Sequence, residues 1–333
     1  MKSFFRAVAL AACLSLLTAC GSYGLWKYPK EQILEQDNAI QLVTVALPPD
    51  ADEVMLDTME MLAAKAKELS DGHLIIKYAQ DKDVLELYQQ GSVDAALLWD
   101  TDITKLNGRL TGLTAPFLFQ DKEKLFTVLS NPNGIAGSAA QKQLKGTVLA
   151  IYYGGTMGIA TRSNQYLAEV GLEGISSLGA DNSLLNNSIF EALGTKKIQF
   201  LLPEEMKELM EGQELRGMEV PLSGNFPAEA KYLEVTRHRI RTLWLMCSQD
   251  AQLSSQHLSL LQEAVAYTIQ SQNDSRNAAE ESFLEQLEGS GVSVVRQDYS
   301  KALFTPAVKL YRDEYEENGI SREVWTTIRS IVE

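Results

Sequence analysis

The chain is poor in the residues that most catalytic and metal sites need. It has only three histidines and three cysteines in 333 residues. His73, His238 and His257 lie far apart, and none has a second His or Cys at the spacing of a zinc site. The Gly-x-Ser-x-Gly elbow and the Walker phosphate loop are both missing, which argues against a serine hydrolase of the usual α/β type and a P-loop nucleotidase. We expect no catalytic residues, metal or cofactor.

Positive charge is also scarce. The chain has 30 Lys and Arg against 44 Asp and Glu, which gives a formal net charge of −14. An acidic surface repels nucleic acid and anionic lipid headgroups, so we expect neither as a partner. Hydrophobic residues make up 45% of the chain, enough for the cores of two domains.

The apolar run near the N-terminus, residues 7–17, is too short to span a bilayer. It follows Lys2 and Arg6 and ends in small residues before Cys20, which resembles a bacterial lipobox. At such a site Cys20 would be diacylated and become the mature N-terminus, with an ordinary secretory signal as the alternative. We therefore expect a lipoprotein signal peptide over residues 1–19, a tether over 20–37, and a periplasmic protein anchored through Cys20.

The same interpretation accounts for all three cysteines. Cys13 would leave with the signal peptide and Cys20 would carry the lipid. Cys247 lies in an apolar run and is predicted to be an inert core thiol. No internal disulfide is then possible.

Apolar patterning predicts an α/β fold. In the first part, helical and strand patterns alternate, which is typical of a parallel layer. After residue 145 the alternation resumes, and long helical patterns follow from residue 254 to the C-terminus. We predict two lobes with a ligand cleft between them. Lobe 1 comprises residues 38–160 plus about 245–333, and lobe 2 comprises about 161–244.

The glycine-rich stretch AIYYGGTMGIATRS, residues 150–163, could be mistaken for a phosphate loop. Its glycines form Gly-Gly-x-x-Gly instead of Gly-x-Gly-x-x-Gly, and β-branched residues continue beyond them where a helix should begin. The stretch therefore predicts strand structure.

Several segments together resemble the solute-binding subunits of TRAP transporters, the DctP-like family. The segments are QQGSVDAALLW, LTAPFLFQDKEKLF, LKGTVLAIYYGGT, FEALG, Glu219-Val220-Pro221-Leu222, and the C-terminal stretch LEQLEGSGVSVVRQDYSKALFTPAVKLYRDEY. Their order spans about residues 38–320. The resemblance implies a two-lobed, type II-like periplasmic binding protein fold with long C-terminal helices, and no enzymatic activity. It also implies a membrane permease as partner.

The chain departs from the family where members hold a ligand carboxylate. The resemblance places Gly179 and Met157 where members carry arginines, Val220 where they carry an asparagine, and Trp99 at a polar position. Without an arginine fork, an apolar or weakly polar ligand is favoured. We predict these cleft residues: Trp99, Tyr152, Tyr153, Met157, Gly179, Leu202, Glu219, Val220, Arg241 and Trp244.

Two alternatives remain open. Arg237, Arg239 and Arg241 alternate in TRHRIRT, so Arg241 could face the cleft and hold a carboxylate in place of the missing arginine. The chain could instead be a protein-interaction module on the same scaffold. A tetratricopeptide-repeat lipoprotein fits as a partner of either a solute-binding protein or an interaction module.

Overall fold

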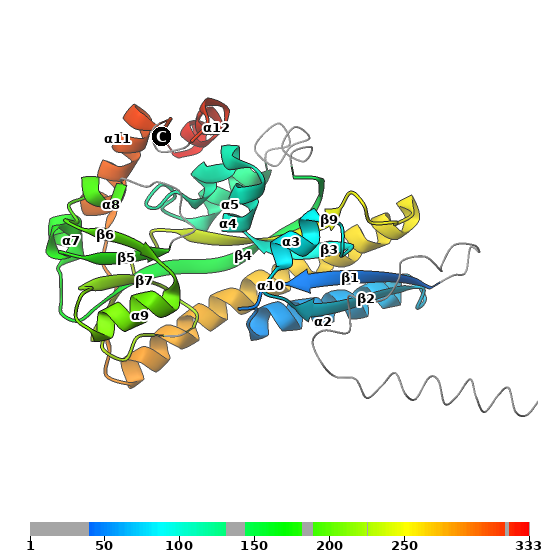
Figure 1. The fold of residues 1–333 in the computed structure, drawn as a ribbon, viewed down its shortest axis with the longest axis horizontal. Coiled ribbons are helices and arrows are strands. Elements are labelled where there is room, and N and C mark those ends of the chain that lie inside the picture. The colour runs from blue at the N-terminus through cyan, green and yellow to red at the C-terminus, as the bar shows by residue number, and fades with distance from the viewer. Residues whose placement is uncertain (1–39, 131–143, 182–188, 225, 317–319, 333) are drawn as a thin grey trace, which may run out of the picture.

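The computed structural model describes residues 40–130, 144–181, 189–224, 226–316 and 320–332 (Figure 1). The predicted signal peptide, the tether and Cys20 lie outside these residues. In the part of the chain that is described, no helix is both long and apolar enough to cross a bilayer.

Three parallel strands open the fold, and β1 lies between the other two. Asp52 caps the first long helix by accepting a hydrogen bond from the N–H of Met55. The predicted parallel α/β layer is therefore confirmed. Its elements are β1 (Gln41–Leu47), α2 (Glu53–Leu69), β2 (Leu74–Gln80), α3 (Val84–Gln89) and β3 (Ala95–Trp99).

Two long strands connect this layer to a second one. β4 (Gly146–Thr161) and β9 (Ile240–Ser248) run antiparallel, and β9 lies between β3 and β4. From Met157 onward, β4 pairs instead with β7 and β8 of the second layer. Residues 150–161 of the glycine-rich stretch thus belong to one continuous strand, β4, which is part of both layers, in agreement with the strand prediction.

The second layer holds shorter strands. β5 pairs in parallel with β6 and β7, and β8 pairs with β4 and β10. These strands are β5 (Leu178–Asp181), β6 (Ile198–Leu201), β7 (Gly217–Pro221), β8 (Tyr232–Glu234) and β10 (Ser293–Val295). We refer to the layer of β1–β3, β9 and the first part of β4 as lobe 1, and to the layer of β5–β8, β10 and the end of β4 as lobe 2.

Helices cover both lobes, and one of them spans the molecule. α10 (Ser255–Gly289) runs along both layers and packs on α2, β4 and β10 (Figure 1). The remaining helical elements are α4 (Asp100–Leu106), η2 (Gly108–Thr114), α5 (Lys122–Ser130), α7 (Leu167–Val170), η3 (Gly171–Gly174), α8 (Ile189–Ala192), α9 (Pro203–Glu211), η4 (Ser300–Phe304), α11 (Thr305–Glu314) and α12 (Arg322–Val332).

The C-terminal segment divides between the lobes. α12 packs on α5 and η2, which follow β3 in the chain. β10, which the predicted boundaries assign to lobe 1, pairs with β8 in lobe 2. The two lobes also share a core, since Trp244 of β9 and Leu178 of β5 belong to one buried apolar cluster.

Candidate functional site

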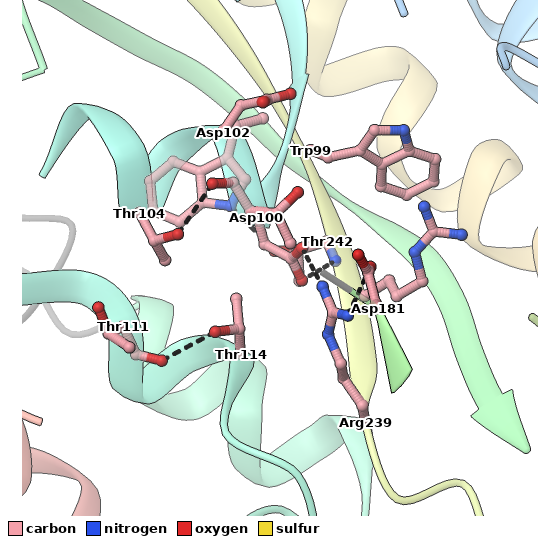
Figure 2. Close-up of polar contacts among 12 residues, drawn as sticks. Trp99, Asp100, Asp102, Thr104, Thr111, Thr114, Asp181, Arg239 and Thr242 are labelled. Atoms are coloured by element: carbon pink, nitrogen blue, oxygen red, sulfur yellow. Dashed lines mark hydrogen bonds and ion pairs between the residues drawn. The ribbon is translucent and has the colours of Figure 1, made fainter. Parts of the chain in front are cut away.

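Arg239 lies just before β9, where the two lobes meet. One of its terminal nitrogens, Nη2, is 3.1 Å from Oδ1 of Asp100, and the other, Nη1, is 3.1 Å from Oδ2 of Asp181 (Figure 2). Asp100 follows directly on β3 of lobe 1, and Asp181 is the last residue of β5 in lobe 2. The carboxyl ends of parallel strands commonly hold functional groups. Here an aspartate at a strand end of each lobe contacts the same guanidinium, that of Arg239.

This cluster is buried, so its charges are strongly coupled. The side chains of Arg239 and Asp100 are each 1% exposed, whereas that of Asp181 is 28% exposed. Burial alone would lower the pKa of Arg239, but Asp100, Asp181 and Glu219 raise it above its usual value. Asp100 also accepts a hydrogen bond from the backbone N–H of Thr242 at 3.1 Å. Arg239 is therefore a permanent cation held between two carboxylates.

Arg241 lies two residues further along β9 and has a different environment. Its guanidinium carbon is 3.6 Å from the centroid of the Trp99 ring. Its nearest acidic partner is Asp50, at 3.9 Å from Nη2 to Oδ2, and that carboxylate already accepts a hydrogen bond from Trp99 Nε1 at 3.0 Å. Burial and the neighbouring Arg239 lower the pKa of Arg241. Arg241 is thus a weakly compensated cation on an aromatic surface.

A second buried pair supports the lobe 2 side of the cluster. Glu219 Oε1 lies 2.7 Å from Nε2 of His238, whose other ring nitrogen is 2.7 Å from the hydroxyl of Thr236. Phe117 stacks on the imidazole with ring centroids 5.0 Å apart. Glu219 Oε2 accepts a hydrogen bond from the backbone N–H of Asp181 at 2.8 Å. The pair therefore fixes the end of β5 and hence the position of Asp181.

The glycines of β4 accommodate the neighbouring groups. A Cβ on Gly154 would lie 2.7 Å from the Trp99 ring. Gly155 has φ +97°, and a Cβ there would lie 3.0 Å from Oε1 of Glu280 on α10. The register with β9 slips at this point, which is a β-bulge. The glycines therefore allow Trp99 and α10 to pack closely against β4.

Three predicted site residues lie at the cluster. Trp99 and Arg241 stack on each other, and Glu219 supports Asp181. A fourth, Met157, is buried, and its backbone N–H donates to the carbonyl of Arg239 at 3.0 Å.

The structure places the six other predicted residues away from this cluster. Tyr152 and Tyr153 face α10, with hydroxyl contacts to Thr268 and Glu280, respectively. Trp244 and Val220 are buried in apolar clusters. A side chain on Gly179 would meet Leu215 and Met206, so this position has no room for an arginine. Leu202 is 49% exposed and occupies the N-cap position of α9. The candidate site does not include these six residues.

The prediction missed Asp100, Asp181 and His238, and it did not place Arg239 in the site. The alternation in TRHRIRT was visible, and Asp100 directly follows the strand pattern DAALLW, whereas the strand that Asp181 ends is seen only in the structure. Strand-end aspartates are the signal that could have found the cluster. Among the described residues, no group of three or more His, Cys, Asp or Glu side chains is arranged to hold a metal ion.

Two α/β lobes that share long connecting strands, with charged groups where their strand ends meet, define a two-lobed binding protein. The sequence profile of the DctP family, bacterial extracellular solute-binding protein family 7, matches residues 46–318. The chain belongs to this family. As a member, it is an extracellular solute-binding protein and not an enzyme.

Solved structures share the fold at low sequence identity. A TRAP periplasmic solute-binding protein from Ochrobactrum anthropi, with a C-terminus bound in its ligand-binding pocket, is 19% identical, with a TM-score of 0.76 over 89% of this chain and 96% of its own. One from Sulfurospirillum deleyianum, with bound succinate, is 15% identical, with a TM-score of 0.70 over 88% of this chain and 99% of its own.

The sugar acid binding protein of Advenella mimigardefordensis, in complex with galactonate, is 19% identical, with a TM-score of 0.70 over 89% of this chain and 98% of its own. No curated protein matches the chain by sequence. The structural likeness confirms the predicted two-lobed fold.

Proposed function

We propose that the protein captures a small acidic molecule between its lobes, holds the acid group with Arg241, and delivers the molecule to a membrane permease. The environment of Arg241 is the observation that carries the proposal. Its side chain is 17% exposed, and it makes no hydrogen bond to the described residues. A guanidinium stacked on an aromatic ring keeps its N–H donors in one plane, which suits a bidentate contact with a carboxylate.

The charges around Arg241 favour this ligand class over the apolar one that the sequence suggested. Asp50, Asp100, Asp181 and Arg239 are all close enough to affect the pKa of Arg241. Covering such charged groups with an apolar ligand would remove their remaining water without replacing its hydrogen bonds. The relatives from S. deleyianum and A. mimigardefordensis bind succinate and galactonate, which are both carboxylates.

Calorimetric titration of the protein, freed of small molecules, with succinate, galacturonate and galactonate tests the proposal. We expect at least one to bind, and Arg241→Ala to weaken binding by at least about 100-fold, since each of the two charge-assisted bonds contributes about 1.5–3 kcal/mol. Arg296→Ala is the matched control, because Arg296 is a half-exposed arginine paired with Glu288.

Unchanged carboxylate affinity in Arg241→Ala would contradict the proposal. Native mass spectrometry of the purified protein provides a second test. A co-purifying neutral, apolar molecule would support the apolar-ligand hypothesis instead. A protein that co-purifies with nothing and binds no carboxylate would support the interaction module.

The proposal includes the anchor and the partners. The lipobox-like sequence before Cys20 supports diacylation, which would keep the protein at the membrane beside TRAP permease subunits. A tetratricopeptide-repeat lipoprotein is the further partner in this proposal. Cys20→Ser is expected to move the protein from the membrane fraction to the soluble fraction, and retention in the membrane fraction would contradict lipid anchoring.

A further inference from the structure

Arg239 is a second cation beside Arg241, and the proposed function does not use it. We propose that Asp181 determines specificity: its carboxylate occupies Arg239 from the ligand side and so restricts the site to molecules with a single acidic group. This inference rests on the proposed function, because it assumes that the ligand binds beside Arg241.

The two carboxylates on Arg239 differ in access. Asp100 is 1% exposed and also holds the backbone N–H of Thr242, so it is part of the protein interior. Asp181 is 28% exposed and contacts Nη1, the other terminal nitrogen of the Arg239 guanidinium. Without the Asp181 side chain, Nη1 would be the nitrogen of Arg239 that a solute could reach. Asp181 therefore fills a position at which a ligand carboxylate could otherwise bind.

Asp181 is held in this position by its own lobe. It ends β5, and its backbone N–H donates to Oε2 of Glu219 at 2.8 Å. Glu219 is in turn fixed by His238, with both side chains fully buried. The charge of Asp181 also acts on Arg241, where it partly offsets the lowering of the pKa by burial and by Arg239. A second acidic group on a ligand at Arg241 would thus meet a fixed like charge, while a hydroxyl or ammonium group would be accommodated.

Paired probes with the same carbon skeleton test the inference: galactonate, which has one carboxylate, and galactarate, which has two. Acetate serves as a small carboxylate that can replace the missing side chain. The full chain is compared as wild type, Asp181→Ala and the control Asp102→Ala. Asp102 lies two residues from Asp100, on the lobe 1 side of the cluster, and pairs with the half-exposed Lys105.

We expect Asp181→Ala to shift the ratio of galactarate to galactonate affinity by about tenfold or more towards galactarate. Excess acetate should raise the melting temperature of Asp181→Ala and not that of the wild type or Asp102→Ala. The inference would be overturned if folded Asp181→Ala kept the wild-type ratio of galactarate to galactonate affinity. It would also be overturned if acetate raised the melting temperature of Asp181→Ala no more than that of the wild type.

The readouts separate this inference from the proposed function. If the wild type binds neither sugar acid, the result counts against the role of Arg241, and acetate stabilisation of Asp181→Ala still decides the role of Asp181. If Asp181→Ala does not fold, Asp181→Asn replaces it, since the amide keeps a hydrogen-bond acceptor for Arg239 but carries no charge. An unchanged ratio in Asp181→Asn would then overturn the inference.

Discussion

Arg239 shows how one buried side chain joins parts of the fold that lie far apart in the sequence. Two carboxylates from different lobes compensate its charge, and its Nε is buried without a hydrogen-bond partner among the described residues. Buried charges are costly when isolated, so each member of the cluster depends on the others.

Arg239→Met is expected to lower the free energy of unfolding by about 3–5 kcal/mol, because it leaves Asp100 buried with no cation beside it except Arg241. Urea denaturation followed by circular dichroism measures this change. Arg296→Met should cost less than about 1 kcal/mol, because its ion pair is exposed. A similar effect in both variants would contradict the structural role of Arg239.

Asp52 gives a pH prediction. Burial would raise its pKa, but the ion pair with Arg276, aided by the Met55 N–H and by Arg241, lowers it below the usual value. The folded pKa is therefore below the unfolded one. The stability that Asp52 contributes is present above the unfolded pKa, about 3.9, and is lost as the pH falls through the folded value.

Asp52→Asn keeps the helix cap but loses the charge. Urea denaturation between about pH 6 and 3 should therefore show a shallower decline in stability for the variant than for the wild type. Equal slopes would show that the ion pair contributes nothing to acid sensitivity.

Cys247 gives a chemical prediction. Burial raises the pKa of its thiol to about 11, so almost no thiolate forms at pH 8. Iodoacetamide should leave Cys247 unmodified in the native protein and alkylate it in guanidinium, as peptide mass spectrometry would show. Rapid modification of the native protein would contradict the predicted inert core thiol.

At the scale of elements, α10 and β4 meet through polar contacts. Four residues spaced by one helical turn, Thr268, Gln272, Arg276 and Glu280, are buried along one face of α10. Glu280 accepts hydrogen bonds from the Tyr153 hydroxyl and from the hydroxyl and N–H of Thr156. This contact lies at the bulge of β4, and it explains why Gly155 is a glycine.

Gly155→Ala should lower the free energy of unfolding by about 1–3 kcal/mol, because alanine disfavours φ +97° and its Cβ would press on Glu280. Gly289→Ala is the matched control, since a Cβ there would meet nothing within 4 Å. Thermal denaturation compares the two. Equal melting temperatures would contradict the strain at the bulge.

The sequence predicted elements well because their signals are local. The alternating pattern of residues 40–99 matches the strands and helices from β1 to β3. The long helical pattern of residues 254–288 matches α10. The charged cluster was not predicted, since Arg239 is 139 residues from Asp100 and 58 from Asp181. Counting along the sequence led to Gly179, but only the fold shows that this position faces α9 and that Asp181 faces Arg239.

At the scale of the whole molecule, two arginines connect the lobes. Arg239 contacts Asp100 of lobe 1 and Asp181 of lobe 2. Arg276 of α10 pairs with Asp52, which caps α2 of lobe 1, and its Nη1 is 3.4 Å from Oγ of Ser223, which follows β7 of lobe 2. The protein therefore has its own contacts for holding the lobes together before a ligand arrives.

Removing both contacts should separate the lobes. Spin labels at the exposed positions of Leu56 in α2 and Tyr166 in lobe 2 can report this by pulsed electron resonance. In the ligand-free Asp52→Ala/Asp181→Ala double variant we expect the distance to increase by more than about 2 Å relative to the wild type. Identical distance distributions would show that these contacts do not hold the lobes together.

The position of β9 has a consequence for how the chain is made. β9 lies between β3 and β4 in the sheet, yet it comes almost 80 residues after β4 ends, so the sheet has a missing central strand until residues 240–248 have been synthesised. Pairings between distant segments form slowly. A chain with this order of strands stays incompletely folded through most of its synthesis, which is the state in which a polypeptide can still be threaded through a translocation channel.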